Sequence, residues 1–449
     1  MSAASLPTAR NTPSSAISRF FAFDHHGTSL GREFVAGITT FTTMSYIVVV
    51  NPAILSAAGI PEGPSFVATV LAAAFGCYLM AFYANRPFAI APYMGENAFI
   101  AFTVVKVLGI PWQTALAAIF LAGALFVVLT VLHLRRWIVD GVPTSLRYSF
   151  AVGMGLFLTF IGLNETGLVR LGVPGAPVRA GLLTSTPVLV AMFGIVLLAI
   201  FLIRKVPGGI LLSILITAVL AFVVKVAAAP HRLVSLPPSL RPILWQLDFH
   251  SALSWRAFPV VLTIFIMVFV DTMGTLIGVS ARAGFLDAEG QLPQIEKPML
   301  VDAITTCVAP ALGTTTSGAY VESATGIEAG GRTGFTVLVT GSCFLLTLFF
   351  APIVAAIPAQ AYGPALILVG LFMLEPITRI DFADFSESIP AFAVVTLMAF
   401  TFNIAIGICA GFVLYPICKL VAGKPHHLKS GLWVLTALSL MFFIFYPYH

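Results

Sequence analysis

Charge is scarce in this chain of 449 residues. Only 9% of the residues are charged, 59% are hydrophobic, and the mean hydropathy is +1.01. A soluble fold of this length cannot bury so much apolar surface. The apolar residues also come in long runs instead of the short alternations of half-buried strands. The composition therefore excludes a soluble protein and predicts an integral membrane protein.

The sequence also lacks clustered cysteines and long basic segments. Its five cysteines stand singly in apolar segments, without a C-x-x-C pair or a nearby His at metal-ligand spacing. The net charge of +5 comes from Lys and Arg scattered through short connections, with no basic run longer than two residues. We therefore expect no metal, no cofactor and no nucleic-acid partner; membrane lipids are the expected surroundings.

Uncharged windows of about 20 residues are frequent, and each is long enough to cross about 30 Å of hydrocarbon. The first half supplies seven of them, and the second half seven or eight, depending on whether residues 388–418 cross twice. The sequence thus predicts an all-α membrane protein of about fourteen spans. The windows are 34–58, 66–84, 88–105, 112–132, 148–163, 187–203 and 208–224, then 257–280, 299–312, 318–329, two within 333–374, 388–418 and 432–446.

Charge placement predicts the topology. Residues 1–30 lack the apolar core of a cleavable signal and are expected to form a cytosolic tail. Residues 31–227 and 255–449 then form two repeats, joined by an extracytoplasmic connection, 228–254. Positive residues fall at every second connection, which predicts a cell-membrane protein with a cytosolic N-terminus. They are Arg19, Arg32, Arg86, Arg135, Arg136, Arg147, Arg204, Lys205, Arg282 and Arg332. Segment 375–387 is an exception to the rule that cytosolic connections are positive, because it is rich in acids and lies on a predicted inner loop.

Halves with an odd number of spans lie in opposite orientations, as in inverted-repeat transporters. The third segment opens with APYMGENAF, and TSGAYVESAT lies near the corresponding place in the second half, so that Glu96 matches Glu322. Both openings are rich in Pro, Gly, Ser or Thr, which predicts extended backbone leading into a half-helix. Such backbone is tolerated at membrane depth only where it lines a cavity or is buried in protein. Two half-helices would aim N–H groups at a shared pocket.

Few carboxylates fall inside the predicted spans. Asp271, Glu322 and Glu96 are expected to line the pocket, since an acid in hydrocarbon is costly and usually carries function. For Glu96 the sequence leaves open whether it faces the pocket or points away while its neighbour Asn97 contacts the ligand. Asp302 lies near a helix start and is expected to be structural, as an ion pair or a cap.

The helix that bears Asp271 has two further features. Thr275 lies one turn beyond Asp271 on the same face, so it joins the candidate pocket. Gly274 and Gly278 form a small-x-x-x-small surface, which predicts close packing against another helix.

Two long motifs carry a family resemblance. VDTMGTLIGVSARAGFLD at 270–287 and TTTSGAYVESATGIEAGGRTGFTVLVTG at 314–341 resemble the AzgA-type adenine, guanine and hypoxanthine permeases of the nucleobase–cation symporter superfamily. The resemblance implies a uracil-permease-like fold of about fourteen spans in two inverted seven-helix repeats, with a core and a gate domain. It also implies proton-coupled import of a purine nucleobase.

By position in those motifs, Glu322 matches the carboxylate that holds the base, Asp271 the acid of the eighth span, and Asn97 the asparagine of the third. Two departures stand out. Val268 occupies a place where the family commonly has a second acid, and Glu96 stands where the family usually reads P-G-M-G-L-N. These departures leave open which purine is carried and how coupling works.

The residues suit such a ligand chemically. A purine is a flat, neutral ring, and a carboxylate can accept hydrogen bonds from its ring N–H and exocyclic amine. We predict that Glu322 contacts the base and Asp271 carries or relays a proton, with Glu96 a candidate for both roles. Whether sodium replaces the proton stays open. The aromatic candidates for stacking on the ring are Tyr320, Tyr93, Phe99 and Phe269.

The same residues bear on other possible functions. Sulfate and bicarbonate transporters share the implied fold, but a pocket with three acids argues against an anion. A uracil or other nucleobase permease stays open, as does a homodimer. An enzyme would need a Ser/His, paired-Asp or metal constellation within the spans, and His133 alone lies at a span end. We therefore expect a transporter without enzymatic activity.

Overall fold

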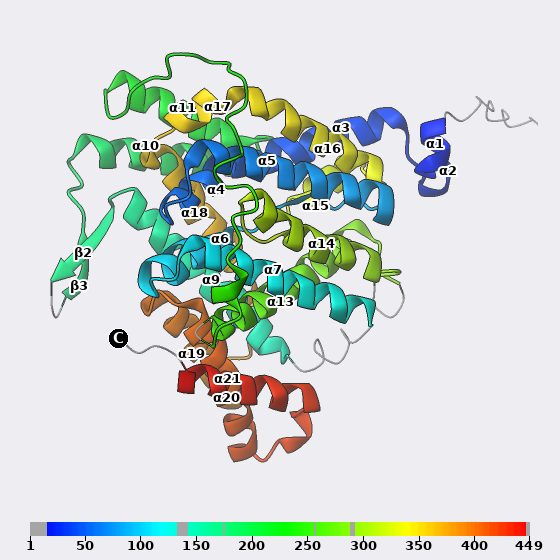
Figure 1. Cartoon of the computed structure of the whole chain (residues 1–449), viewed down its shortest axis with the longest axis vertical. Coiled ribbons are helices and arrows are strands. Elements are labelled where there is room, and N and C mark those ends of the chain that lie inside the picture. The colour runs from blue at the N-terminus through cyan, green and yellow to red at the C-terminus, as the bar shows by residue number, and fades with distance from the viewer. Residues whose placement is uncertain (1–15, 133–141, 174–175, 256, 288–291, 446–449) are drawn as a thin grey trace, which may run out of the picture.

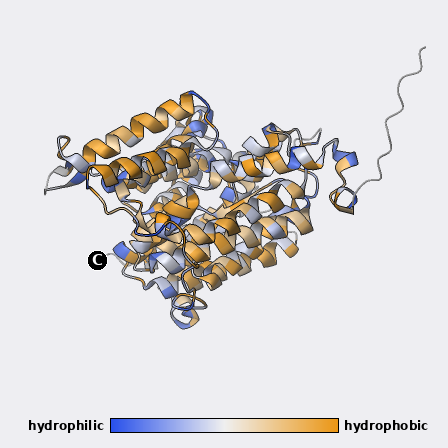
Figure 2. Cartoon of the chain, turned by 90° about the horizontal axis from the view of Figure 1, so that it is seen from above, coloured by the Kyte–Doolittle hydropathy of each residue, from blue (hydrophilic) through white to orange (hydrophobic). Residues whose placement is uncertain are grey.

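The computed structural model describes residues 16–132, 142–173, 176–255, 257–287 and 292–445 (Figure 1). His133, Arg135 and Arg136, which entered the sequence predictions, lie outside these ranges, as does the start of the expected cytosolic tail. Hydrophobic residues cover most of each long helix, while hydrophilic residues lie mainly in connections and at helix ends (Figure 2). This distribution is the one expected of helices that contact lipid.

The first half runs as follows. Its elements are α1 (Ala16–Phe20), α2 (Phe23–His26), α3 (Leu30–Met44), α4 (Ile47–Ser56), α5 (Glu62–Leu79), the π-helical η1 (Met80–Ala84), β1 (Ile90–Pro92), α6 (Met94–Ala98), the π-helical η2 (Phe99–Val107), α7 (Trp112–Val131), α9 (Thr144–Glu165), β2 (Val169–Val173), β3 (Ala176–Ala180), α10 (Thr186–Ile203) and α11 (Gly209–Val223).

The second half follows after a long connection. Its elements are α12 (Phe249–Ala252), α13 (Phe258–Ala283), α14 (Glu296–Leu312), β4 (Ser317–Ala319), α15 (Ser323–Glu328), α16 (Gly334–Thr347), η3 (Leu348–Phe350), α17 (Ala351–Ala356), α18 (Ala359–Phe372), η4 (Glu375–Arg379), α19 (Phe385–Phe400), α20 (Ile404–Val421), η5 (Pro425–His427) and α21 (Ser430–Phe445).

Within the described ranges, nine helical stretches are long and apolar enough to cross a membrane. Shorter or broken segments complete seven per half: α3–α4, α5, β1–α6–η2, α7, α9, α10 and α11, then α13, α14, β4–α15, α16, α18, α19 and α20. Residues 388–418 belong to two helices, α19 and α20. The second half therefore has eight helical segments when α21, which lies beyond the repeat, is included.

Helices of each half pack on helices of the other half, and the pattern is the same in both directions. The fourth segment of each half packs on the first two of the other, since α16 contacts α3 and α5 while α7 contacts α13 and α14. The fifth segment behaves likewise, because α18 contacts α10 and α11 while α9 contacts α19 and α20. The first four segments of both halves form a core domain, and the last three form a gate domain. Two intertwined inverted repeats, as predicted, have this arrangement.

A short antiparallel ladder joins the two halves inside the core domain. Strands β1 and β4 pair through Ile90 with Ala319, Ala91 with Gly318 and Pro92 with Ser317. These positions are fully buried, so the ladder satisfies backbone groups that water cannot reach. The strands lead into the short helices α6 and α15. The predicted extended stretches and half-helices are thereby confirmed.

The long connection crosses one end of the core domain. The N–H of Ser235 donates to the carbonyl of Phe349 (3.0 Å), that of Trp245 to Ala311 (2.8 Å) and that of Asp248 to Gln113 (3.3 Å). The acceptors lie where α7 begins and where α14 and η3 end. The connection therefore covers a single end of the molecule, and its predicted place outside the cell stays a prediction.

In the gate domain, α9 and α18 cross through glycines. A Cβ added to Gly155 would lie 2.7 Å from the carbonyl oxygen of Gly370, and one added to Gly162 would lie 2.9 Å from that of Gly363. At such distances the two helix backbones are in direct contact, as small residues allow in membranes.

Substitution of Gly155 by Val should therefore destabilise the gate domain by about 1–3 kcal/mol, because the rigid backbone of α18 cannot move away from the added side chain. Thermal unfolding of the purified protein in detergent measures this change. Gly31→Val is the matched control, since a Cβ at Gly31 meets nothing within 4 Å. Equal stability of the two variants would contradict the packing described.

Candidate functional site

The predicted carboxylates gather around the strand ladder. Glu96 lies in the short helix α6, Glu322 immediately precedes α15, and Asp271 lies midway along α13, which contacts α6, α15 and β4. Tyr320 lies near enough to all three acids to be affected by the charge of each. The structure thus brings together, from three segments, the residues that the sequence placed in one pocket.

Glu96 and Asp271 form a pair. Glu96 is fully buried, and no hydroxyl, amide or basic group in the described part of the chain donates to either of its carboxyl oxygens. Its carboxyl group faces that of Asp271, close enough for a hydrogen bond. An ionised carboxylate can only accept, so this bond forms only when one of the two acids carries a proton. Glu96 therefore faces Asp271 rather than pointing away from the other acids.

Glu322 is held at one oxygen and available at the other. The hydroxyl of Tyr46, in the break between α3 and α4, donates to Oε1 of Glu322 at 2.9 Å. The Oε2 atom is buried and has no hydrogen-bond partner within the described residues. The neighbouring Val321 is 53% exposed, so the segment borders open space. Glu322 thus has one oxygen oriented by Tyr46 and one oxygen without a partner among the described residues.

The face of α13 that carries Asp271 is open. Gly274 and Gly278 are exposed, and a Cβ added to either would meet nothing within 4 Å. The prediction that these glycines pack closely against another helix is therefore wrong. Thr275 is half-buried one turn beyond Asp271. No other helix in the described part of the chain therefore covers α13 at these two glycines.

Asn97 belongs to a buried polar network. Its Nδ2 donates to Oδ1 of Asn51, and its Oδ1 accepts from the hydroxyl of Thr315. Asn51 in turn donates to the hydroxyls of Thr69 (2.6 Å) and Thr314 (3.0 Å). Both ends of the Asn97 amide are therefore used to tie α6 to α4 and to the approach to β4. Its contact with a ligand stays a prediction.

Asp302 has a different structural role from the one expected. It is fully buried in α14, well after the helix begins. Its Oδ2 accepts from the N–H of Ala319 (3.1 Å) and the hydroxyl of Tyr93 (3.4 Å). It is therefore neither a cap nor half of an ion pair: it fastens strand β4 to α14.

The aromatic candidates divide into two groups. The rings of Tyr93 and Tyr320 lie parallel, with centroids 6.2 Å apart and planes 8° apart, and the Tyr320 hydroxyl donates to the carbonyl of Pro92. Phe269 packs edge-on against Phe126 at 5.5 Å, and Phe99 is fully buried. The two tyrosines border the acids, whereas Phe269 and Phe99 are core residues in this conformation.

Some polar residues at and near the site escaped the sequence reasoning. Tyr46 and Asn51 stand in the apolar run SYIVVVNPAIL, and a hydroxyl and an amide in such a run are signals that could have found them. Glu33 is also fully buried. It accepts from the N–H of Arg332 and the hydroxyls of Thr333 and Thr336, and so fastens α3 to the start of α16.

Comparison with known proteins decides the family. The model described as Permease family (Xan_ur_permease) matches residues 31–410. The chain belongs to this family. It is 38% identical to the guanine/hypoxanthine permease PbuG of Bacillus subtilis, over 95% of this chain and 99% of that one. It is 36% identical to the adenine permease AdeP of Escherichia coli, over 96% and 97%. The resemblance identified from the motifs is confirmed, and these relatives are permeases rather than enzymes.

A solved structure agrees with the fold. The transmembrane domain of the cyanobacterial bicarbonate transporter BicA superposes with a TM-score of 0.63 at 16% identity, covering 85% of this permease and 97% of that chain. At this identity the likeness shows the architecture alone. The permease is therefore a multi-pass membrane protein with the predicted all-α fold.

Replacement of Tyr46 by Phe should weaken ligand binding by roughly tenfold, because a hydrogen bond to a charged group is worth about 1.5–3 kcal/mol. The ring would still fill its buried position, so the protein should fold. The half-saturation concentration of uptake measures the effect. Tyr83→Phe is the control, since Tyr83 is an exposed tyrosine of η1. An unchanged half-saturation constant in Tyr46→Phe would show that Tyr46 does not orient Glu322 for the ligand.

Proposed function

We propose that this permease imports a purine nucleobase, namely adenine, guanine, hypoxanthine or xanthine, by proton symport with alternating access. The names of the relatives support the purine class. The observation that carries the mechanism is the arrangement of three acids around the ladder, beside an open face of α13; Glu96 is fully buried, and Asp271 and Glu322 are half-buried. We place it in the cell membrane with its N-terminus in the cytosol, on the basis of the charge pattern.

Glu322 is the proposed anchor for the base. Tyr46 fixes one of its oxygens, which leaves Oε2 to accept from a ring N–H or an exocyclic amine. A ligand on the Asp271 face of α13 would also meet Thr275. A purine presents both donors and acceptors on its edge, so an acid and a hydroxyl can read it together.

The Glu96–Asp271 pair is the proposed proton site. One proton lets the two carboxyl groups hydrogen-bond, and its loss leaves two like charges facing each other in a buried place. Loss of the proton would therefore change the position of Asp271, which lines the pocket next to the base. Binding of the base and binding of the proton are linked through Asp271, and symport requires such a link.

An anion exchanger of the same fold is the main alternative. An anion would need a basic or neutral pocket, but no Lys or Arg in the described part of the chain forms an ion pair with Glu96, Asp271 or Glu322. The three acids therefore favour a neutral ligand that donates hydrogen bonds. Uracil is a smaller ring with a different set of hydrogen-bond donors and acceptors, and uptake measurements distinguish a uracil permease from a purine permease.

Uptake of labelled adenine, guanine, hypoxanthine, xanthine and uracil into a transport-deficient cell tests the proposal. We expect uptake of at least one purine, its collapse with a protonophore, and a loss of at least about tenfold in Glu322→Gln, because the amide replaces an acceptor by a donor. Glu328→Gln, at an exposed acid of the same short helix, should behave as the native protein. Preference for uracil or for an anion, or full uptake by Glu322→Gln, would refute it.

A second experiment addresses coupling. Glu96→Leu restores the apolar residue usual at this place and should remove the dependence of uptake on the proton gradient, because Asp271 loses its partner. Adding Val268→Glu, at the place where an acid is common in the family, should return much of that dependence. The ratio of uptake with and without protonophore is the readout. Undiminished protonophore sensitivity in Glu96→Leu would show that the pair does not couple transport.

A further inference from the structure

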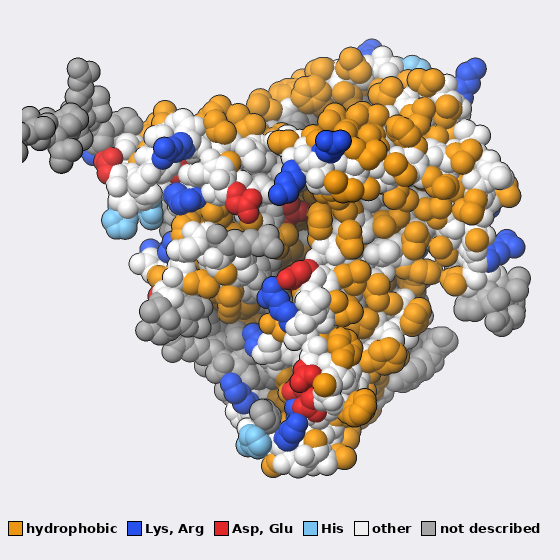
Figure 3. Space-filling view, turned by 180° about the vertical axis from the view of Figure 1, so that it is seen from behind, with side chains coloured by type: hydrophobic (Ala, Val, Ile, Leu, Met, Phe, Trp, Pro, Cys, Tyr) orange, Lys and Arg blue, Asp and Glu red, His pale blue; other side chains and the backbone are white. Residues whose placement is uncertain are grey.

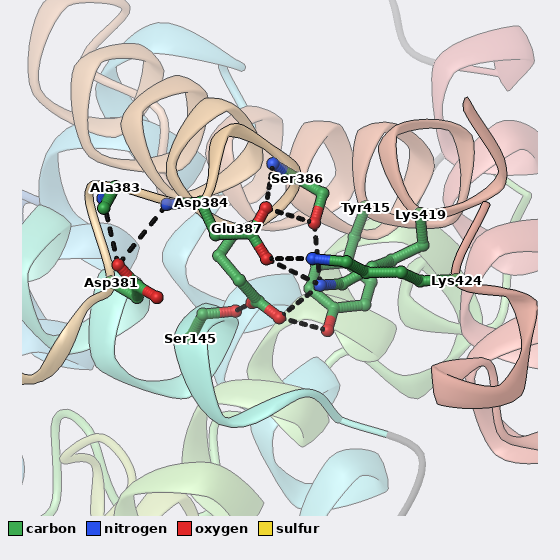
Figure 4. Close-up of polar contacts among 9 residues, drawn as sticks. All are labelled: Ser145, Asp381, Ala383, Asp384, Ser386, Glu387, Tyr415, Lys419 and Lys424. Carbon is green, nitrogen blue, oxygen red and sulfur yellow. Dashed lines mark hydrogen bonds and ion pairs between the residues drawn. The ribbon is translucent and has the colours of Figure 1, made fainter. Parts of the chain in front are cut away.

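A second charged site lies in the gate domain. A cavity of about 450 Å³ is bounded by the start of α9, the segment before α19, the end of α20 and the start of α21. Figure 4 shows polar side chains from the first three of these elements converging on one another. Its volume falls within the range of about 300–1,000 Å³ typical of small-molecule sites. None of the acids proposed to carry transport lines it.

The cavity has a rigid wall built around a buried lysine. The side chain of Lys419 is 2% exposed and its ammonium lies 2.6 Å from Oε1 of Glu387. It also donates to the hydroxyl of Ser386 at 2.8 Å and lies over the ring of Tyr415. Glu387 further accepts from the hydroxyls of Ser145 and Tyr415. These contacts join α9, α19 and α20, so the wall is fixed before any ligand arrives (Figure 4).

The lining has more positive than negative charge. Five basic and three acidic side chains line the cavity, an excess of two positive charges. The basic residues are Arg147, Arg379, Lys419, Lys424 and Lys429, and the acids are Asp381, Asp384 and Glu387. On the face drawn in Figure 3, charged side chains gather along a hollowed band beside a broad hydrophobic surface.

The acids of the lining are already used by the wall. Asp384 accepts from Lys424 at 2.7 Å and lies 3.7 Å from Lys419. Hydrogen bonds from Lys424 and Ser386 hold the pKa of Asp384 well below its ordinary value, so it stays ionised and paired. Arg379 pairs instead with Glu375, which is outside the lining. Glu375 therefore offsets one of the two excess positive charges, and the lining keeps a net positive charge.

The start of α9 adds to the positive potential inside the cavity. The helix follows Pro143, which supplies no side-chain cap, and Thr144 and Ser145 line the cavity. The first N–H groups of a helix lack internal partners and favour negative charge. Backbone and side chains thus act in the same direction.

We propose that this cavity binds a negatively charged phosphate group. Convergent Arg and Lys side chains beside a helix start suit phosphate oxygens, and the cavity leaves room for the group that carries the phosphate. The carrier is either an anionic lipid, since basic pockets between helices at a membrane surface bind lipid headgroups, or a soluble phosphate. A bound phosphate would tie α9, the approach to α19 and α21 together, and so stabilise the gate domain.

Thermal unfolding of the full-length protein in neutral detergent tests the proposal. The additives are phosphatidylglycerol against phosphatidylcholine, and sodium phosphate against sodium chloride at equal ionic strength. The variant is Arg379→Gln with Lys429→Gln, and Arg379→Gln alone serves if the double variant does not fold. The Arg379 ion pair is more than half exposed, so its loss costs little. Arg204→Gln, at an exposed arginine after α10, is the control.

We expect stabilisation of the native protein and of Arg204→Gln by at least one phosphate additive. The concentration for half of this effect should rise roughly tenfold in the pocket variant. Stabilisation by phosphatidylglycerol alone identifies a lipid site, and stabilisation by inorganic phosphate identifies a soluble ligand. No stabilisation by either additive, or the same stabilisation in the pocket variant, overturns the proposal.

Discussion

Pairing of β1 with β4 is the constraint on which the rest of the core domain depends. Inside a bilayer every backbone N–H and C=O needs a partner within the protein, so a helix can be interrupted only where something replaces its lost bonds. The ladder from Ile90–Ala319 to Pro92–Ser317 does this for both interruptions at once. Asp302 holds the end of β4, and the Asn97 network holds the segment just before β4. Without these contacts neither short helix would have a fixed start.

The acids beside the ladder are held in place by contacts of their own. Buried carboxylates are expensive, and the protein accepts that cost only where they are oriented for use. Glu322 is oriented by Tyr46, while Glu96 and Asp271 orient each other. The two solutions differ in kind, since a phenol donates at all times and a carboxyl group donates only when protonated. The first arrangement suits the proposed ligand contact, and the second suits the proposed proton site.

Much of this arrangement could be predicted from sequence, and the failures have physical reasons. Composition and charge gave the membrane class, and Gly- and Pro-rich openings gave the broken helices. Gly274 and Gly278 misled, because a small-residue pattern shows that a close approach is allowed, not that a neighbour is present. Asn97 lies in the predicted half-helix, but its partners come from α4 and from the approach to β4, which spacing along the chain does not reveal. The sequence did not predict Tyr46 as a site residue for the same reason, since its partner Glu322 is far away along the chain.

The acidic segment before α19, which strained the charge rule, is explained by the same long-range packing. Its acids meet Lys419 and Lys424, which lie far along the chain at the end of α20 and after it. The segment is therefore close to neutral once folded. A rule that counts charges along the chain cannot see this compensation.

The backbone contact between α9 and α18 has a mechanical consequence. Helices that touch through Gly155 and Gly162 have no side-chain layer to slide on, so any rotation of one against the other drives carbonyl oxygens into the opposite chain. The two helices should therefore move together. The gate domain should then move as a rigid body, and its hinges should lie in the connections that lead into and out of it.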